Sequence, residues 1–386
     1  MASWTLYQLV LAAVMLVTGS INTLSTKWAD ISTANGDPKY DEEYPDPRTF
    51  NHPFFQAVCM FIGESSCLLV FKLIILYKTC KRKPIDIGDQ KFSPLVMLAP
   101  AMCDMCATSL MYMGLNLTFA STFQMLRGAV VIFTGLLSVA FLNRRLRVYQ
   151  WWGIFLVFLG LIVVGLADVI APPSDQQAQN ITNIITGDLL IIMAQIITAS
   201  QMVIEEKFLS KYNVQPLQAV GWEGIFGFTV LSILLVPFYF IQLKAIRVGV
   251  PDYRLEDAID ALFQLRNNSI ILVATIGTIL SIAFFNFAGI SVTKEMSATT
   301  RMVLDSLRTV VIWAVSLLAG WEEFNPVQLL GFVILLLGTF VYNDVFFPPM
   351  YRKYVKGETP EERPLLSPES QEAVINYEDS GRSIKT

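Results

Sequence analysis

The segment Gln150-Trp-Trp-Gly-Ile-Phe-Leu-Val-Phe-Leu-Gly-Leu-Ile-Val-Val-Gly-Leu-Ala167 is apolar after its first residue and carries no charged side chain. About 20 such residues, coiled as a helix, cross the roughly 30 Å of hydrocarbon in a lipid bilayer. Backbone groups in hydrocarbon must satisfy one another, and a run of this length does so as a helix rather than as a barrel strand. The segment therefore predicts a transmembrane helix.

The same pattern recurs along the whole chain of 386 residues, which is 54% hydrophobic and 16% charged. Soluble domains are about 45–50% apolar and about 25% charged. We therefore predict an all-α membrane protein with ten transmembrane helices and no soluble domain. The predicted ranges are 4–25, 53–77, 94–114, 119–141, 151–170, 187–206, 216–241, 269–291, 297–319 and 326–346. No Lys or Arg precedes the first run, so we expect a retained helix rather than a signal peptide.

The two halves of the chain resemble each other. The matching pairs, which occur in the same order, are Thr18–Trp28 with Thr198–Phe208, Gln56-Ala-Val58 with Gln218-Ala-Val220, and Gln150-Trp-Trp-Gly153 plus Gly160 with Gln328-Leu-Leu-Gly331 plus Gly338. We therefore predict a first five-helix repeat at 1–170 and a second at 171–346. A polar tail at 347–386 follows, and its composition predicts disorder.

Each repeat contains an odd number of spans, so the second copy lies upside down relative to the first. Inverted repeats of this kind are typical of secondary transporters, in which the solute site lies near the bilayer midplane between the repeats. The alternative is an inactive scaffold that keeps the same architecture.

The distribution of basic residues predicts the orientation. With ten spans, the loops and tail on the side of the termini hold seventeen Lys and Arg residues, and the opposite loops hold seven. The positive-inside rule places both termini in the cytosol. The sequons at Asn180 and Asn267 fall in the opposite, non-cytosolic loops, where glycosylation is possible.

Arg301, Asp305 and Arg308 lie four and three residues apart in the ninth span and therefore share one helical face. A charge in the middle of a bilayer costs about 2.5–3.5 kcal/mol, so these residues require partners or a function. One carboxylate between two guanidinium groups leaves a positive stripe that suits a phosphate or carboxylate of a solute. The alternative is an ion pair within the helix that only neutralises Asp305.

Gln124 and Arg127 share a face of the fourth span. When the two repeats are aligned, Arg127 of the first repeat corresponds to Asp305 of the second. We hypothesise that these two residues face each other across the cavity and form a gate pair. The alternative gives each of them a separate structural partner.

Other polar residues lie deep in the spans. Glu64 and Asp104 are candidates for proton coupling, because burial raises a carboxylic acid's affinity for protons. The alternative is a hydrogen-bonded helix contact. Asn22, Gln195 and Glu205 lie on polar stripes that we expect to line the cavity, and Glu223 is a weaker candidate.

Several other functions are not supported. Cys103-Asp-Met-Cys106 has no second pair of ligands, so no zinc site is expected. There is no phosphate-binding glycine loop or nucleophile–base arrangement, so no enzyme, cofactor or nucleic-acid partner is predicted. We expect the single histidine, His52, to be inert beside Pro53. The amphipathic stretch Leu255–Leu262 is expected to rest on the non-cytosolic membrane surface.

The tail contains Glu361-Glu-Arg-Pro-Leu365-Leu366. An acidic residue four positions before a Leu-Leu pair is the pattern that clathrin adaptor complexes recognise on cytosolic tails. Glu361, Leu365 and Leu366 therefore predict a lysosomal or late-endosomal membrane, with the Golgi membrane as the second choice.

Five motifs are specific when taken as a set: Thr18-Gly-Ser-Ile-Asn-Thr23, Ser121-Thr-Phe-Gln-Met-Leu-Arg-Gly128, Thr186-Gly-Asp-Leu-Leu-Ile-Ile-Met-Ala-Gln195, Phe284-Phe-Asn-Phe-Ala-Gly-Ile-Ser-Val-Thr-Lys294 and Ser297-Ala-Thr-Thr-Arg-Met-Val-Leu-Asp-Ser-Leu-Arg308. In these motifs the chain resembles solute carrier family 35, specifically its F branch, in the drug/metabolite transporter superfamily.

The resemblance implies the drug/metabolite transporter fold and antiport of nucleotide-linked sugars or other organic anions. The expected solute-binding residues are Asn22, Gln124, Arg127, Asn286, Lys294, Asp305 and Arg308. In GDP-mannose transporters a Gly-Ala-Leu-Asn-Lys run contacts the ligand. Here Asp305-Ser-Leu-Arg308-Thr309 occupies its place without the lysine.

Two alternatives remain from the sequence. The chloroquine-resistance transporters, a related group, would imply proton-coupled export of basic solutes or peptides. A non-transporting membrane adaptor is the other alternative. The oligomeric state is not predicted.

Overall fold

The computed structural model describes residues 5–40, 47–81, 93–115, 117–118, 120–142, 146–170, 181–212, 214–243, 253–296, 298–320 and 324–342. The helices are α1 (Leu6–Ile31), α2 (Pro53–Cys80), α3 (Leu98–Leu115), α4 (Ala120–Leu126), α5 (Val130–Leu142), α6 (Val148–Ile170), α7 (Ile181–Tyr212), α8 (Pro216–Phe240), α9 (Ala258–Asn267), α10 (Ser269–Glu295), α11 (Ala298–Leu318) and α12 (Pro326–Tyr342). Two short strands, β1 (Thr33–Ala34) and β2 (Arg48–Thr49), pair antiparallel. The 3₁₀ turns are η1 (Pro38–Tyr40), η2 (Pro94–Met97) and η3 (Arg127–Ala129).

The part of the chain that the structure describes is an all-α membrane protein. Within these residues, eight helical segments are long and apolar enough to cross a bilayer: α1, η2 with α3, most of α4 to α5, and α2, α6, α7, α8 and α10. The charged helix α11 and the 17-residue apolar helix α12 correspond to the last two predicted spans. Large apolar side chains point outward from these helices, for example Trp152, Phe155 and Phe158 of α6, as a surface in contact with lipid requires.

Local sequence signals set several helix boundaries. Pro53, Pro216 and Pro326 occupy the first position of α2, α8 and α12, where the missing N–H has no helical partner to lose. The Asn268 side chain accepts a hydrogen bond from the backbone N–H of Ile270 and so begins α10 directly after α9.

The predicted fourth span, 119–141, is divided into α4 and α5 by the 3₁₀ turn η3. Gly128 lies in this turn against Leu335 of α12, and a Cβ at this position would approach the Leu335 side chain to 2.7 Å. The α-helical hydrogen-bonding pattern therefore changes to a 3₁₀ turn at Arg127, the residue that the sequence assigns to the cavity.

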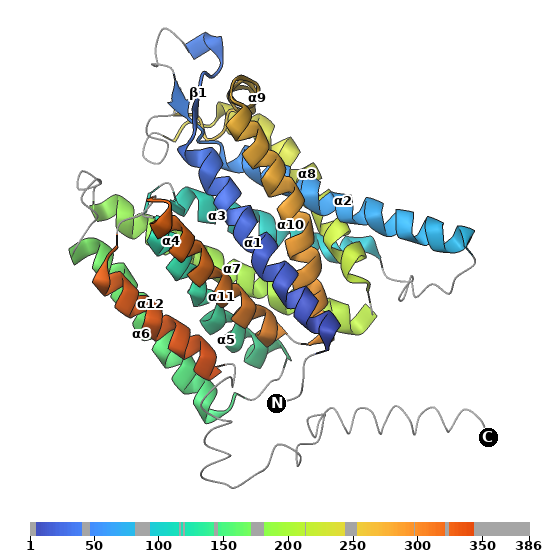
Figure 1. Cartoon of the computed structure of the whole chain (residues 1–386), viewed down its shortest axis with the longest axis vertical. Coiled ribbons are helices and arrows are strands. Elements are labelled where there is room, and N and C mark those ends of the chain that lie inside the picture. The colour runs from blue at the N-terminus through green and yellow to red at the C-terminus, as the bar shows by residue number, and fades with distance from the viewer. Residues whose placement is uncertain are drawn as a thin grey trace. The chain divides into compact units, whose positions relative to one another are not determined.

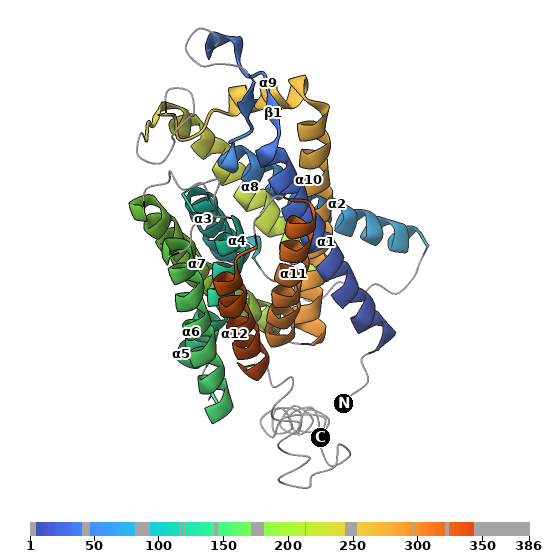
Figure 2. The same cartoon turned by 60° about the vertical axis from the view of Figure 1, so that its left-hand side comes forward.

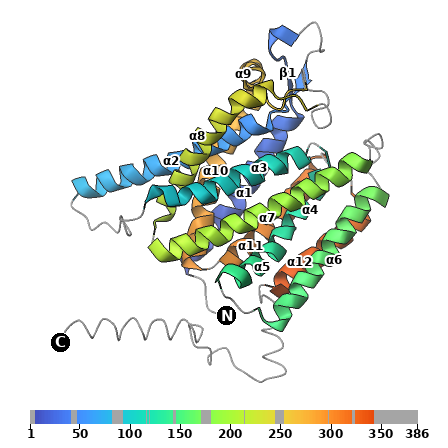
Figure 3. The same cartoon turned by 180° about the vertical axis from the view of Figure 1, so that it is seen from behind.

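Helices from the two halves of the chain pack in pairs (Figure 1). α1 packs on α10, α2 on α8, α3 on α7 and α6 on α12. The view from behind shows α3 and α7 side by side, and the turned view shows α6 with α12 at the edge of the bundle (Figures 2 and 3). The strands and α9 lie together at one end of the bundle.

Glycines allow the closest of these contacts. On α6, Gly160 faces the carbonyl oxygen of Gly331 on α12, and an added Cβ would lie 2.9 Å from that oxygen. Gly338 similarly faces the carbonyl of Gly153, again at 2.9 Å from an added Cβ. These four residues are the repeated glycines of the sequence, and they bring the two helix backbones together as small residues do in membranes.

We therefore expect Gly160→Leu to destabilise the protein by about 1–3 kcal/mol, because the added side chain must push α12 away. The measurement is the thermal midpoint of the detergent-solubilised protein. Gly165→Leu on the same helix is the matched control, since an added Cβ there meets no atom within 4 Å. Equal midpoints for the two variants would contradict the close contact.

Candidate solute cavity

A cavity of about 540 Å³ lies among α1, α2, α3, α4, α7, α8, α10 and α11. Its volume is typical of sites for small molecules, which are about 300–1,000 Å³. The side chains around it are strongly polar for a membrane protein. The predicted residues that line it are Asn22, Glu64, Asp104, Gln124, Arg127, Gln195, Glu205, Glu223, Asn286, Arg301, Asp305 and Arg308.

Some predicted residues lie elsewhere. Lys294 is exposed near the end of α10, where its Nζ lies 3.5 Å from the carbonyl oxygen of Val214, and it does not line the cavity. Asn267 is exposed at the end of α9. Asn180, Glu361, Leu365 and Leu366 lie outside the described residues.

Arg308 is almost completely enclosed, with 3% of its surface exposed. One guanidinium nitrogen lies 2.8 Å from the Asp305 carboxylate, and another donates to the Gly19 carbonyl at 3.5 Å. The guanidinium also lies over the Phe285 ring, 4.7 Å from its centre. A Cβ at Gly19 would lie 2.6 Å from the Arg308 side chain, so this glycine makes the room that Arg308 occupies.

This conformation shows the intrahelical ion pair between Asp305 and Arg308. Within the described ranges, Asp305 has no ion pair with Arg127. Arg127 is half-buried and lies 5.9 Å from the centre of the Phe123 ring, on the same cavity. The Oε1 atom of Gln124 is buried there and has no hydrogen-bond partner among the described residues. Arg127 and Gln124 can therefore form hydrogen bonds with a ligand.

Besides Asp30 of α1 and Asp305 of α11, four carboxylates line the cavity, each from a different helix. Glu64 of α2 accepts a hydrogen bond of 2.6 Å from the side-chain amide of Asn286. Asp104 of α3 accepts a longer bond, 3.4 Å, from the Thr108 hydroxyl. Glu205 of α7 pairs with Arg301 at 3.2 Å. Glu223 of α8 is 7% exposed.

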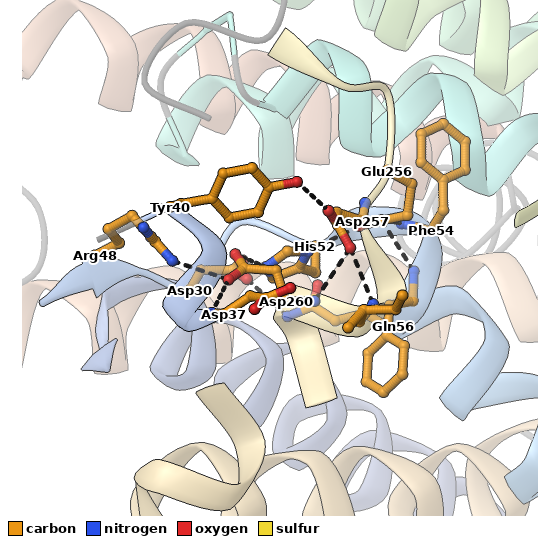
Figure 4. A network of polar contacts seen from close by, with 12 residues as sticks. Asp30, Asp37, Tyr40, Arg48, His52, Phe54, Gln56, Glu256, Asp257 and Asp260 are labelled. Carbon is orange, nitrogen blue, oxygen red and sulfur yellow. Dashed lines mark hydrogen bonds and ion pairs between the residues drawn. The ribbon is translucent and has the colours of Figure 1, made fainter. Parts of the chain in front are cut away.

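A second polar network lies at the end of the bundle that carries α9 (Figure 4). His52 is 3% exposed, and its Nδ1 lies 2.8 Å from Glu256 while its Nε2 lies 3.4 Å from Asp260. Arg48 pairs with Asp260 at 2.9 Å. We call Arg48, His52, Glu256 and Asp260 the loop latch. His52 also lines the cavity, so the loop latch borders the cavity through this residue.

The loop latch also fixes the start of α2. The second carboxylate oxygen of Glu256 accepts the backbone N–H groups of Phe54 at 2.8 Å and of Phe55 at 3.1 Å. These N–H groups lack partners within the helix, and a carboxylate at this position is favoured by the helix dipole. Nearby, the Tyr40 hydroxyl donates to Asp257 at 2.8 Å.

One prediction about this region is wrong: His52 is not inert, because two carboxylates hold its ring. In the segment Leu255–Leu262, the acidic side chains of Glu256, Asp257 and Asp260 are buried against the protein, and the apolar side chains of Ile259 and Leu262 are exposed. The contact of this segment with the membrane surface stays a prediction. The sequence contains one signal for the contact of His52 with this loop, because three acidic residues lie close together in the loop and the chain has a single histidine. About 200 residues separate the histidine from this loop, so the sequence alone does not indicate that they meet.

The pKa values of His52 and Asp260 move in opposite directions. Burial lowers the pKa of His52, but hydrogen bonds to Asp260 and Glu256 outweigh it, and the net pKa is raised above 6.5. Burial raises the pKa of Asp260, but His52, the Asp37 backbone and Arg48 outweigh it, and the net pKa is lowered below 3.8.

A raised His52 pKa means that the latch contributes its full stability below pH 6.5 and loses it as pH rises through the folded-state pKa. We therefore expect His52→Gln to lower the thermal midpoint most at pH 5.5–6.5 and progressively less at higher pH. Asp260 remains ionised throughout this window because its pKa lies below 3.8.

Tyr40→Phe is the control for this experiment, because it removes the hydrogen bond to Asp257 without removing a group that titrates between pH 5.5 and 8.5. Its effect should stay constant with pH. A His52→Gln deficit that is also constant would show that His52 does not change charge in the folded protein.

Apolar helices that surround a charged cavity define a membrane protein with a site for a small molecule. Comparison with known proteins identifies its family. A family model for nucleotide-sugar transporters matches residues 48–236. Human solute carrier family 35 member F6 is 56% identical over 97% of this chain and 97% of that protein. The member F6 protein of Rattus norvegicus is 57% identical over 90% of this chain and 91% of that protein.

The chain belongs to solute carrier family 35, in its F branch. This is a family of transporters rather than enzymes. A protein of known crystal structure shares the fold, with a TM-score of 0.55 and 11% identity over 87% of this chain and 98% of that one.

Proposed function

We propose that the protein is a secondary transporter that moves a small organic anion, a nucleotide sugar or a related metabolite, across an endolysosomal or secretory membrane by alternating access. The observation that carries this proposal is the position of Arg127 and Arg308 on one cavity. Guanidinium groups bind phosphate and carboxylate with paired hydrogen bonds. The match to a family model of nucleotide-sugar transporters supports the same substrate class.

The pairing of the helices supports two inverted repeats of five spans. In this scheme the first repeat comprises α1, α2, α3, α4 with α5, and α6. The second repeat comprises, in the same order, α7, α8, α10, α11 and α12. Replacing each helix by its counterpart in the other repeat turns the α1–α10 pair into the α7–α3 pair, and it leaves the α2–α8 and α6–α12 pairs unchanged. All four pairs occur among the described helices.

Alternating access follows from this arrangement. The loop latch holds the end of the cavity beside α9, and we propose that it opens when the solute exchanges on that side. The exposed position of Asn267 at the end of α9 supports assigning this end to the non-cytosolic side. Both termini are then cytosolic.

Arg127→Gln is the sharpest test of the anion site, because Arg127 is half-buried and the change leaves the ion pair of Arg308 intact. Loss of a charge-assisted hydrogen bond weakens binding by about 1.5–3 kcal/mol, or about ten- to a hundredfold. The measurement is counterflow uptake by proteoliposomes against nucleotides and nucleotide sugars.

Arg266→Gln is the matched control, because Arg266 is exposed near the end of α9 and does not line the cavity. It should transport as the unchanged protein does. Unchanged transport by Arg127→Gln, or no uptake of any anion on the panel by the unchanged protein, would contradict the proposed substrate class.

The tail provides a test of the proposed compartment. Leu365→Ala combined with Leu366→Ala should move the protein from endosomes and lysosomes to the cell surface, because the adaptor complex loses both apolar contacts. Immunofluorescence and surface biotinylation measure this, with Pro368→Ala as a control outside the motif. An unchanged distribution would refute sorting by Leu365 and Leu366.

A further inference from the structure

The cavity contains more acidic side chains than an anion requires. Glu64, Asp104, Glu205 and Glu223 line it from α2, α3, α7 and α8, and we call these four residues the acidic cluster. The carboxylates of Asp104 and Glu205 lie close enough to Glu64 to interact with it electrostatically, and all three interact with Glu223. Such a cluster repels the phosphate or carboxylate that Arg127 and Arg308 attract.

The protein itself compensates this charge only in part. In the described ranges, the one ion pair that reaches the acidic cluster joins Arg301 to Glu205. Glu64 is held by the neutral amide of Asn286, and Asp104 by the neutral hydroxyl of Thr108. Arg301 is also close enough to Asp104 and Glu223 to interact with them electrostatically, so one guanidinium group is shared by three carboxylates. Desolvated like charges in a low-dielectric site are costly, and a single cation leaves the acidic cluster short of positive charge.

Glu223 is the clearest case of a carboxylate whose pairing is incomplete. Only 7% of its surface is exposed, and it lies on the cavity wall. Its Oε1 atom has no hydrogen-bond partner among the described residues. Gly224 lets α8 lie directly against α2, because an added Cβ would approach the carbonyl carbon of Glu64 to 2.7 Å. The close packing therefore holds Glu223 beside Glu64.

The spacing of the carboxylates indicates the kind of cation that the acidic cluster can hold. Among the described residues, no three acidic, cysteine or histidine side chains converge closely enough to hold a metal ion. An alkylammonium group is larger, carries three N–H donors and can satisfy carboxylates that do not meet at one point. The cavity of about 540 Å³ has room for such a group together with an anionic one.

We propose that the acidic cluster is a second subsite that binds the ammonium group of the transported solute, whose anionic group lies at Arg127 and Arg308. The substrate is then a small organic zwitterion rather than a simple anion. This inference rests on the proposed transport function, and it assigns to Glu223 the role of a direct solute contact.

The test measures ligand-induced shifts of the thermal midpoint of the full-length protein in lipid nanodiscs. The probe for the acidic cluster is 1,5-diaminopentane, and 1,5-pentanediol is its uncharged analogue of the same length. The diamine should stabilise the unchanged protein and the diol should not. Glu223→Gln keeps the side-chain shape, and it should weaken binding of the diamine at least tenfold, as should Asp104→Asn.

Glu295→Gln is the matched control, because Glu295 is exposed at the end of α10 and does not line the cavity. It should bind the diamine as the unchanged protein does. The inference is overturned if the diamine fails to stabilise the unchanged protein, or if it stabilises Glu223→Gln and Glu295→Gln equally.

A parallel titration with ethyl phosphate separates this inference from the proposed function. Ethyl phosphate probes the anion site, so its binding should weaken in Arg127→Gln and persist in Glu223→Gln. Binding of ethyl phosphate without binding of the diamine would retain the anion transporter and overturn the second subsite. If Glu223→Gln then altered only the pH dependence of ethyl phosphate binding, the acidic cluster would be assigned to proton coupling instead.

Discussion

Hydrocarbon cannot solvate a guanidinium group, and this constraint explains the position of the charged face of α11. Arg301, Asp305 and Arg308 would each be costly against lipid, so the helix can cross a membrane only if other helices cover that face. α1 and α10 provide part of the cover through the Gly19 carbonyl and the Phe285 ring. The cavity is thus a consequence of shielding as well as a place for a solute.

The lipid environment also constrains the contacts between helix backbones. Helices in a membrane gain no hydrophobic free energy by associating, so close packing must provide the attraction. The reciprocal glycines Gly160 and Gly331 allow it between α6 and α12, and Gly114 and Gly187 do so between α3 and α7. These contacts join helices from one half of the chain to helices from the other.

His52 and Glu256 of the loop latch are fully paired, because both ring nitrogens of His52 and both carboxylate oxygens of Glu256 have partners. In the cavity, atoms of Gln124 and Glu223 have no hydrogen-bond partner among the described residues. Paired groups hold a conformation, whereas buried unsatisfied groups are costly until a ligand or a proton reaches them.

Apolar run length by itself determined that the chain is a helical membrane protein, because only helices of that length satisfy the backbone in hydrocarbon. Helical periodicity also identified most of the charged and polar cavity residues, since a buried charge is conspicuous in an apolar run. Tertiary structure alone decided the partners: Arg308 rather than Arg127 holds Asp305, Lys294 lies outside the cavity, and His52 meets Glu256 from the other half of the chain. Periodicity gives the face on which a side chain lies, but contacts between distant segments depend on how the helices pack, and no local pattern records that.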